Sequence, residues 1–142
     1  MPRLPAARPT LALLSVPLCG LVLAACGTTV STGSFKGEQH EVAQVISNLQ
    51  ADTTAGEQKK VCANDVSAAV VAKLGGTKGC EKAIKSQLAE VDNLNVTIQS
   101  IAIAPGGSTA TAHVTSTYEG KAKAGTVGFV KEGKVWKIST AS

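Results

Sequence analysis

The chain has 142 residues, of which 44% are hydrophobic, 3% aromatic and 17% charged. This length supports one small domain with a modest core. Lysine and arginine outnumber aspartate and glutamate by 14 to 10, a net charge of +4. Because Arg3 and Arg8 lie near the start, a chain that begins at Cys26 has 12 basic and 10 acidic residues, or +2. So mild a charge does not indicate nucleic acid, and we expect no such partner.

The first 25 residues have the three parts of a secretory signal. Arg3 and Arg8 form a positively charged start, and residues 10–25, TLALLSVPLCGLVLAA, are apolar and end in small side chains. A permanent membrane helix needs roughly 20 apolar residues, and this shorter stretch also contains Pro17. We therefore expect residues 1–25 to be a signal peptide that is removed.

Residues 23–26, Leu-Ala-Ala-Cys, place an apolar residue three positions before a cysteine, with small residues between them. This pattern resembles the lipobox of bacterial lipoproteins, in which the cysteine thiol accepts a lipid and the peptide is cleaved just before it. The resemblance implies cleavage between Ala25 and Cys26, and a lipid anchor on Cys26 at the extracytoplasmic face of the cell membrane. Acyl chains contribute about 0.8 kcal/mol per buried methylene, so two or three would give lasting attachment. A plain signal peptide that happens to end near a cysteine is the alternative.

The segment after Cys26, GTTVSTGSFKG, is rich in glycine, serine and threonine and has no periodicity. Such a composition is typical of a flexible tether. We therefore expect residues 26–37 to be the lipidated cysteine and its tether, and residues 38–142 to form the folded domain.

Three helical patterns follow, over residues 38–52, 57–76 and 79–93. In each, apolar residues recur three or four positions apart, which places them on one face of a helix. These faces are Val42, Val45, Ile46 and Leu49; Cys62, Val66, Ala69, Val70 and Leu74; and Cys80, Ile84, Leu88 and Val91. Gly75 and Gly76 can end the second helix in a left-handed conformation. Because the faces are narrow, we expect each helix to pack by one side on something flat.

The second half of the chain predicts four antiparallel strands. In the first, LNVTIQSIAIA, the alternation of apolar residues shifts by one position, which indicates a β-bulge at Gln99–Ser100 and a bent sheet. The stretch STATAHVTSTYEG alternates again, and KAKAGTVGFV and KVWKIS complete a meander. The expected fold class is α+β, with three N-terminal helices packed on a curved four-stranded antiparallel sheet.

The four cysteines have separate expected roles. Cys19 is lost with the signal and Cys26 takes the lipid, so Cys62 and Cys80 remain as a pair in an oxidising compartment. We expect a disulfide between them, which would stabilise the fold by roughly 3 kcal/mol. Free thiols and a metal site are the alternatives. A metal site would need two further ligands, and neither histidine has a suitable spacing, so we expect no metal and no cofactor.

The order of helices, bulged strand and meander resembles small secreted members of the nuclear-transport-factor-like superfamily. This is the cone-shaped, cystatin-type α+β fold shared with steroid isomerases and polyketide cyclases. The resemblance covers about residues 38–140 and includes a closing strand pattern, which is matched here by Val130, Lys131, Gly133, Trp136, Lys137 and Ile138. It implies a pocket between sheet and helices that is open at one end.

No set of polar residues has a spacing that predicts a catalytic site. Asp65 is interpreted as an exposed or capping residue near a helix start, and Asp92 as part of a turn. His113 belongs to a threonine-rich face that either meets solvent or lines the pocket, and Tyr118 is interpreted as a core or rim aromatic. Trp136 is interpreted as a core residue, with a ligand platform as the alternative. His113, Tyr118 and Trp136 are thus the candidates for the pocket or its rim.

These expectations favour a membrane-anchored, extracytoplasmic lipoprotein that is not an enzyme and that binds an apolar small molecule or lipid in a cone-shaped pocket. The first alternative is an envelope protein–protein interaction module whose cone is filled by its own side chains. The second is an isomerase-like or cyclase-like enzyme. Fold alone does not decide between them.

Overall fold

A computed structural model of the chain describes residues 30–88, 95–118 and 120–142. Its helices are α1 (Glu38–Thr54), α2 (Gln58–Lys60), the π-helical turn η1 (Val61–Asp65), α3 (Ala68–Lys73) and α4 (Gly76–Leu88). Its strands are β1 (Asn95–Ile103), β2 (Thr109–Tyr118), β3 (Lys121–Glu132) and β4 (Val135–Ala141). The strands form one antiparallel sheet in the order β1-β2-β3-β4. The predicted α+β class and the four-stranded antiparallel meander are confirmed.

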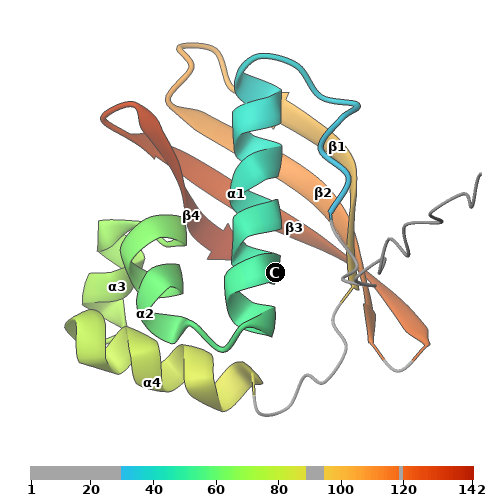
Figure 1. Ribbon diagram of the computed structural model, residues 1–142. Coiled ribbons are helices and arrows are strands. Elements are labelled where there is room, and N and C mark those ends of the chain that lie inside the picture. Colours follow the sequence, from blue (N-terminus) through green and yellow to red (C-terminus); the bar gives the residue numbers. More distant parts are fainter. Residues whose placement is uncertain (1–29, 89–94, 119) are drawn as a thin grey trace, which may run out of the picture.

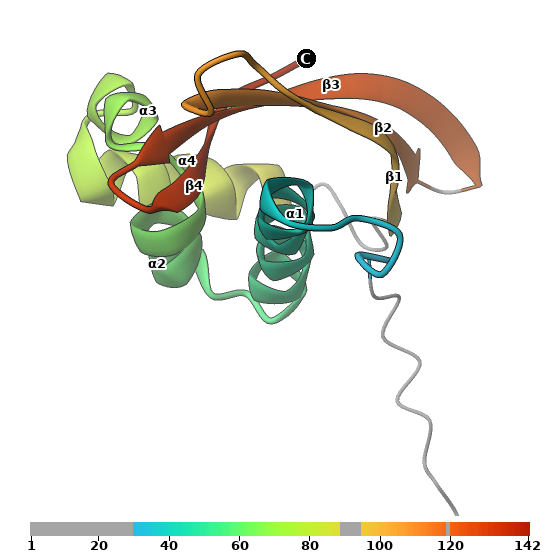
Figure 2. The ribbon, with the colours of Figure 1, turned by 90° about the horizontal axis from the view of Figure 1, so that it is seen from above.

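The helices do not all pack on the sheet. Figure 1 shows α1 lying across the sheet, while α2, α3 and α4 gather beside β4. Viewed from above, the sheet bends over α1 (Figure 2). The helix α4 packs against α2, η1 and α3. The prediction of three helices packed on the sheet is therefore not confirmed, because the second predicted helix is broken and its parts, α2, η1 and α3, pack against α4.

The main core lies between α1 and the concave face of the sheet. The predicted apolar face of α1 is confirmed, since Val42, Val45 and Ile46 are buried and Leu49 packs at the edge of the core. They meet buried residues from all four strands, which are Ile101, Ala110, Ala112, Val114, Phe129, Trp136 and Ile138. Alternate residues of a strand face opposite sides, so only one face of the sheet contributes.

The predicted β-bulge in the first strand is confirmed. Ile98 pairs with Val114 and Ser100 pairs with His113, which leaves Gln99 as the extra residue of β1. A bulge bends its strand and restores the inward direction of the apolar residues that follow. Ile101 thereby reaches the core, where it is 6% exposed.

The second predicted helix is interrupted at Val66 and Ser67, which are both extended. The Val66 N–H donates to the Val61 carbonyl in a π-helical turn, and Val66 then pairs in parallel with Ile138 of β4. The Ser67 N–H donates to the Ile138 carbonyl at 2.9 Å, and the Ser67 hydroxyl accepts from Val70 to begin α3. Short polar side chains such as serine and aspartate can hydrogen-bond the nearby backbone and so compete with a continuous helix. The spacing of apolar residues does not reveal such a break.

Packing begins earlier in the chain than residue 38. Val30 is buried and belongs to the core, and Phe35 packs against it. The Thr32 carbonyl also lies 3.2 Å from Nδ1 of His40 in α1. The folded part thus includes residues 30–37, which the sequence assigned to the tether. All of the described core comes from residues 30–142.

Trp136 joins the sheet to the start of α1. The side chain is 1% exposed, as the core interpretation expected. The Lys131 ammonium lies 5.3 Å from the centre of the indole ring and also pairs with the Glu38 carboxylate of α1. Trp136 therefore both fills the core and supports an ion pair between two elements.

We predict that Trp136→Ala lowers the free energy of unfolding by about 3–5 kcal/mol, because it removes the largest fully buried side chain. The matched control is Val135→Ala in the same strand. Val135 is 54% exposed, so this variant should cost less than about 1 kcal/mol. Urea unfolding of residues 27–142 measures both, and equal losses would refute the assignment of Trp136 to the core.

Candidate functional site

An apolar cavity of about 400 Å³ lies between α1, α3, α4 and β4. We call it the β4 cavity. Its buried floor is formed by Val66 and Ile138, the two residues that pair between the helical region and the sheet. Volumes of roughly 300–1,000 Å³ are usual for small-molecule sites, so this cavity suits a small ligand.

The β4 cavity becomes more polar and more exposed toward its mouth. Half-buried residues surround the middle, which are Leu49, Thr53, Val70, Ile84 and Ser139. Exposed residues form the mouth, which are Leu74, Gln87, Thr140 and Ala141. Leu74 is 39% exposed, a large apolar side chain presented to solvent at the entrance. None of the described residues that line the cavity carries a charge.

The short helix α3 forms one wall of the β4 cavity. None of its residues, all of which the structure describes, is buried. Its position is set at the start by Glu132, whose Oε1 accepts from the Ala68 N–H at 2.9 Å. It is set at the end by Gly75 and Gly76, which have φ values of 90° and 81° and so turn the chain into α4. The predicted left-handed ending at these glycines is confirmed.

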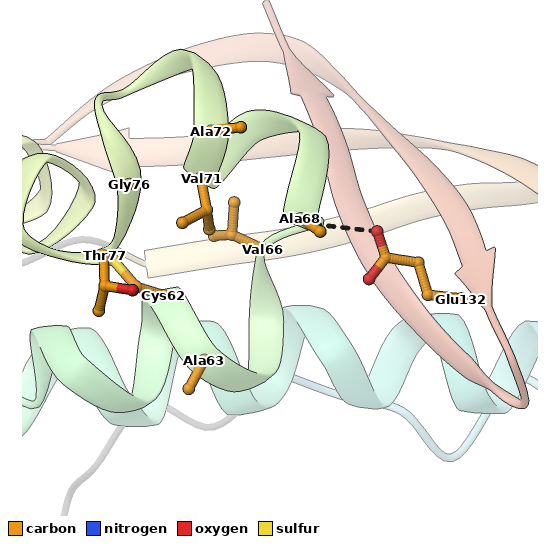
Figure 3. Close-up of a pocket in the computed structure, with 9 residues that line it drawn as sticks. All are labelled: Cys62, Ala63, Val66, Ala68, Val71, Ala72, Gly76, Thr77 and Glu132. Atoms are coloured by element: carbon orange, nitrogen blue, oxygen red, sulfur yellow. Dashed lines mark hydrogen bonds between the residues drawn. The ribbon is translucent and has the colours of Figure 1, made fainter.

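A second cavity, of about 360 Å³, lies on the other side of α3 (Figure 3). We call it the disulfide cavity, because Cys62 lines it together with Thr77 and Glu132. Val71 of α3 faces it, whereas the neighbouring Val70 lines the β4 cavity. The disulfide cavity is more open to solvent, which makes the β4 cavity the better candidate for a ligand site.

The Cys62–Cys80 pair encloses α3 in a covalent loop. The two residues form the disulfide that the sequence predicted. Cys62 lies in η1 and Cys80 in α4, and both are buried. The elements on each side of α3 are therefore tied together, which compensates for the little packing that α3 makes.

Asp65 is buried, and its interpretation as an exposed or capping residue is wrong. It is 2% exposed at the end of η1, and Oδ2 finds no hydrogen-bond partner among the described residues. Burial, and to a smaller extent the nearby charge of Asp52, raise the pKa of this carboxyl to about 6, although the Lys137 charge acts in the opposite direction. Lys137 itself donates to the carbonyls of Ala63 and Asn64. Asp65 does not line the described part of either cavity.

The structure does not bring the sequence-predicted pocket residues together. His113 is exposed on the face of the sheet opposite α1, with a ring nitrogen 3.5 Å from the Thr126 hydroxyl. Trp136 lies in the core, and neither it nor His113 lines the β4 cavity or the disulfide cavity. Tyr118 ends β2. Ala25, Cys26 and Asp92 lie outside the described residues.

The β4 cavity instead uses residues that the sequence assigned to helix packing. Val66, Val70, Leu74 and Ile84 were expected to lie on apolar helix faces, and they do line a common space. One signal in the sequence could have indicated a cavity. The three predicted helices have more apolar surface than one face of a four-stranded sheet can cover. Nothing in the sequence pattern indicated that Ser139, Thr140 and Ala141 at the end of β4 would also line the cavity.

The described ranges contain neither a candidate metal site nor a candidate membrane-spanning helix. No group of three or more histidine, cysteine, aspartate or glutamate side chains in this part of the chain could hold a metal ion. Over the same residues, no helix is both long enough and apolar enough to span a membrane. Comparison with protein-family models and with curated proteins finds no match for the chain.

We predict that the protein loses stability as the pH rises through about 6. The pKa of Asp65 in the folded state, about 6, is above the ordinary value, so folding favours the protonated carboxyl. The favourable contribution is complete at low pH and is lost as the carboxyl ionises. Asp65→Asn should remove this dependence and stabilise the fold at neutral pH by at most about 3 kcal/mol. Urea unfolding between about pH 4 and pH 8 measures both proteins.

Asp52→Asn provides a second test that the pH dependence comes from the raised pKa of Asp65. Removing the Asp52 charge should move the pH midpoint of the stability loss downward, because that charge helps to raise the pKa of Asp65. If Asp65→Asn showed the same pH dependence as the unchanged protein, the dependence would not come from Asp65.

Proposed function

We propose that the protein is a membrane-anchored, extracytoplasmic lipoprotein that is not an enzyme and that binds an apolar small molecule or lipid. The proposal includes the nuclear-transport-factor-like fold that the sequence resembles. The ligand is held between the helices and β4 rather than inside the cone, because the core fills the space between α1 and the concave face of the sheet. The observation that carries the binding function is the β4 cavity, an apolar space of about 400 Å³ between the helices and the last strand.

The chemistry of the cavity wall supports binding rather than catalysis. General acid–base chemistry needs titratable groups that converge on the ligand. The described lining residues are aliphatic, threonine, serine and glutamine, and the buried carboxyl of Asp65 is not among them. An apolar ligand would gain by covering Leu74, Val70 and Ile84, which are only partly buried in the free protein.

The proposed lipid anchor rests on the pattern of residues 23–26. The place where the folded part of the chain begins limits how far the domain can lie from the membrane. Val30 already belongs to the core, so four peptide units connect it to Cys26. Four residues span at most about 14 Å. A lipid on Cys26 would therefore hold the domain directly at the membrane surface, where apolar and amphiphilic ligands are abundant.

The binding function predicts uptake of the neutral apolar dye N-phenylnaphthylamine by residues 27–142. Val70→Trp should weaken this uptake by about tenfold or more, because the indole would occupy the β4 cavity. Val71→Trp is the matched control, since it makes the same change on the same helix but toward the disulfide cavity. Dye fluorescence measures both, and cooperative unfolding of each variant shows that it folds.

Two outcomes would contradict binding in the β4 cavity. One is the absence of any dye uptake by the unchanged, folded protein. The other is an equal loss with Val70→Trp and Val71→Trp, since only Val70 lines the β4 cavity.

The anchor predicts that Cys26→Ser abolishes labelling of the expressed protein by radioactive palmitate, because the serine hydroxyl cannot replace the thiol as lipid acceptor. Cys19→Ser, which changes a cysteine inside the same apolar stretch, should leave the labelling intact. Continued labelling of the Cys26→Ser protein would refute the lipobox assignment.

A further inference from the structure

The β4 cavity has an order from floor to mouth that restricts what can fill it. The floor, Val66 and Ile138, is buried and wholly aliphatic. The middle adds the aliphatic side chains of Leu49, Val70 and Ile84 and the hydroxyls of Thr53 and Ser139. Among the described lining residues, Gln87 carries the one amide side chain, and it lies at the exposed mouth. A ligand that matches this order has a hydrocarbon part that enters first and a polar part that stays at the mouth.

The described wall also excludes the reverse orientation. It contains no charged residue, so a charged group carried to the Val66–Ile138 floor would lose its hydration without gaining a partner. The hydroxyl of Thr53 already donates to the Gln50 carbonyl at 2.9 Å, which uses its proton within the protein. A charged group is therefore not rewarded at the Val66–Ile138 floor, whereas each buried methylene is.

The size of the cavity limits the number of chains. At about 400 Å³ it lies near the lower end of the roughly 300–1,000 Å³ range of small-molecule sites. One flexible chain can follow such a space between helix side chains, and two chains of a common membrane lipid exceed it.

We propose that the β4 cavity binds a single-chain amphiphile tail first, with the end of the chain against Val66 and Ile138 and the head group at the mouth beside Gln87. This inference rests on the proposed binding function and names its ligand class. The ligand is a separate molecule. The folded chain begins in the segment 30–37, which lies beside β1 in Figures 1 and 2, whereas the cavity lies at β4, the opposite edge of the sheet.

The test is a series of linear primary alcohols from butanol to decanol, added to residues 27–142 and followed by methyl NMR shifts of Val66, Val70 and Ile84. Affinity should rise about fourfold with each methylene, which corresponds to about 0.8 kcal/mol, until the chain reaches the floor. Beyond that length the affinity should level off. A rise that continues through decanol, or no rise at all, would overturn tail-first insertion.

Two substitutions locate the floor and the mouth. Val66→Ala deepens the cavity, so the length at which the affinity levels off should increase by at least one methylene. Leu74→Ala changes only the mouth and should leave that length unchanged. An unaltered length with Val66→Ala, in a protein that still binds the alcohols, would overturn the placement of the chain end.

The arms of the experiment separate three kinds of failure. If the dye binds but no alcohol does, the ligand class is wrong and the binding function stands. If neither binds, both proposals fail. If the alcohols bind to residues 27–142 but not to the acylated, membrane-anchored protein, the occupant is the chain's own lipid rather than a separate amphiphile.

Discussion

The pairing of Val66 with Ile138 ties the helical region after α1 to the sheet, and the positions of α3 and of the β4 cavity depend on it. It forces the chain out of helical conformation for two residues, and the Ser67 N–H then completes the contact with a hydrogen bond to the Ile138 carbonyl. The same contact protects part of the edge of β4, which would otherwise present unpaired backbone groups. It also forms the floor of the β4 cavity, so the interruption of the helix creates the site.

This arrangement leaves Asp65 in an unfavourable environment. The π-helical turn that leads to Val66 carries the Asp65 carboxyl inward, where Oδ2 has no partner among the described residues. Lys137, one residue before Ile138, donates instead to the carbonyls of Ala63 and Asn64. The cation thus donates its hydrogen bonds to the end of the turn, and its charge offsets only part of the rise in the Asp65 pKa. The raised pKa of Asp65 is the electrostatic cost of joining the helices to β4 at this point.

The sequence predicted the sheet better than the helices. In β1, apolar residues alternate with polar ones, and this alternation shifts by one position at Gln99. Because successive side chains of a strand point to opposite faces of the sheet, neighbouring residues alone reveal both the strand and its bulge. The break at Val66 could not be predicted in the same way. Its apolar face continues through Val70 and Leu74 in register with a single helix, and the competing partner, Ile138, lies 72 positions later in the chain. The candidate site was missed for the same reason, since it exists only where these distant segments meet.

The wall formed by α3 shows how a domain of this size can keep an apolar cavity. A well-packed helix would close the space, and α3 is instead fixed at its two ends by Ser67 and Glu132, by the two glycines, and by the disulfide that spans it. Constraint through the covalent loop replaces burial, so Val70 and Leu74 remain available. A ligand that covers them supplies the packing that α3 lacks, and it stabilises the folded state more as its free concentration rises above the Kd.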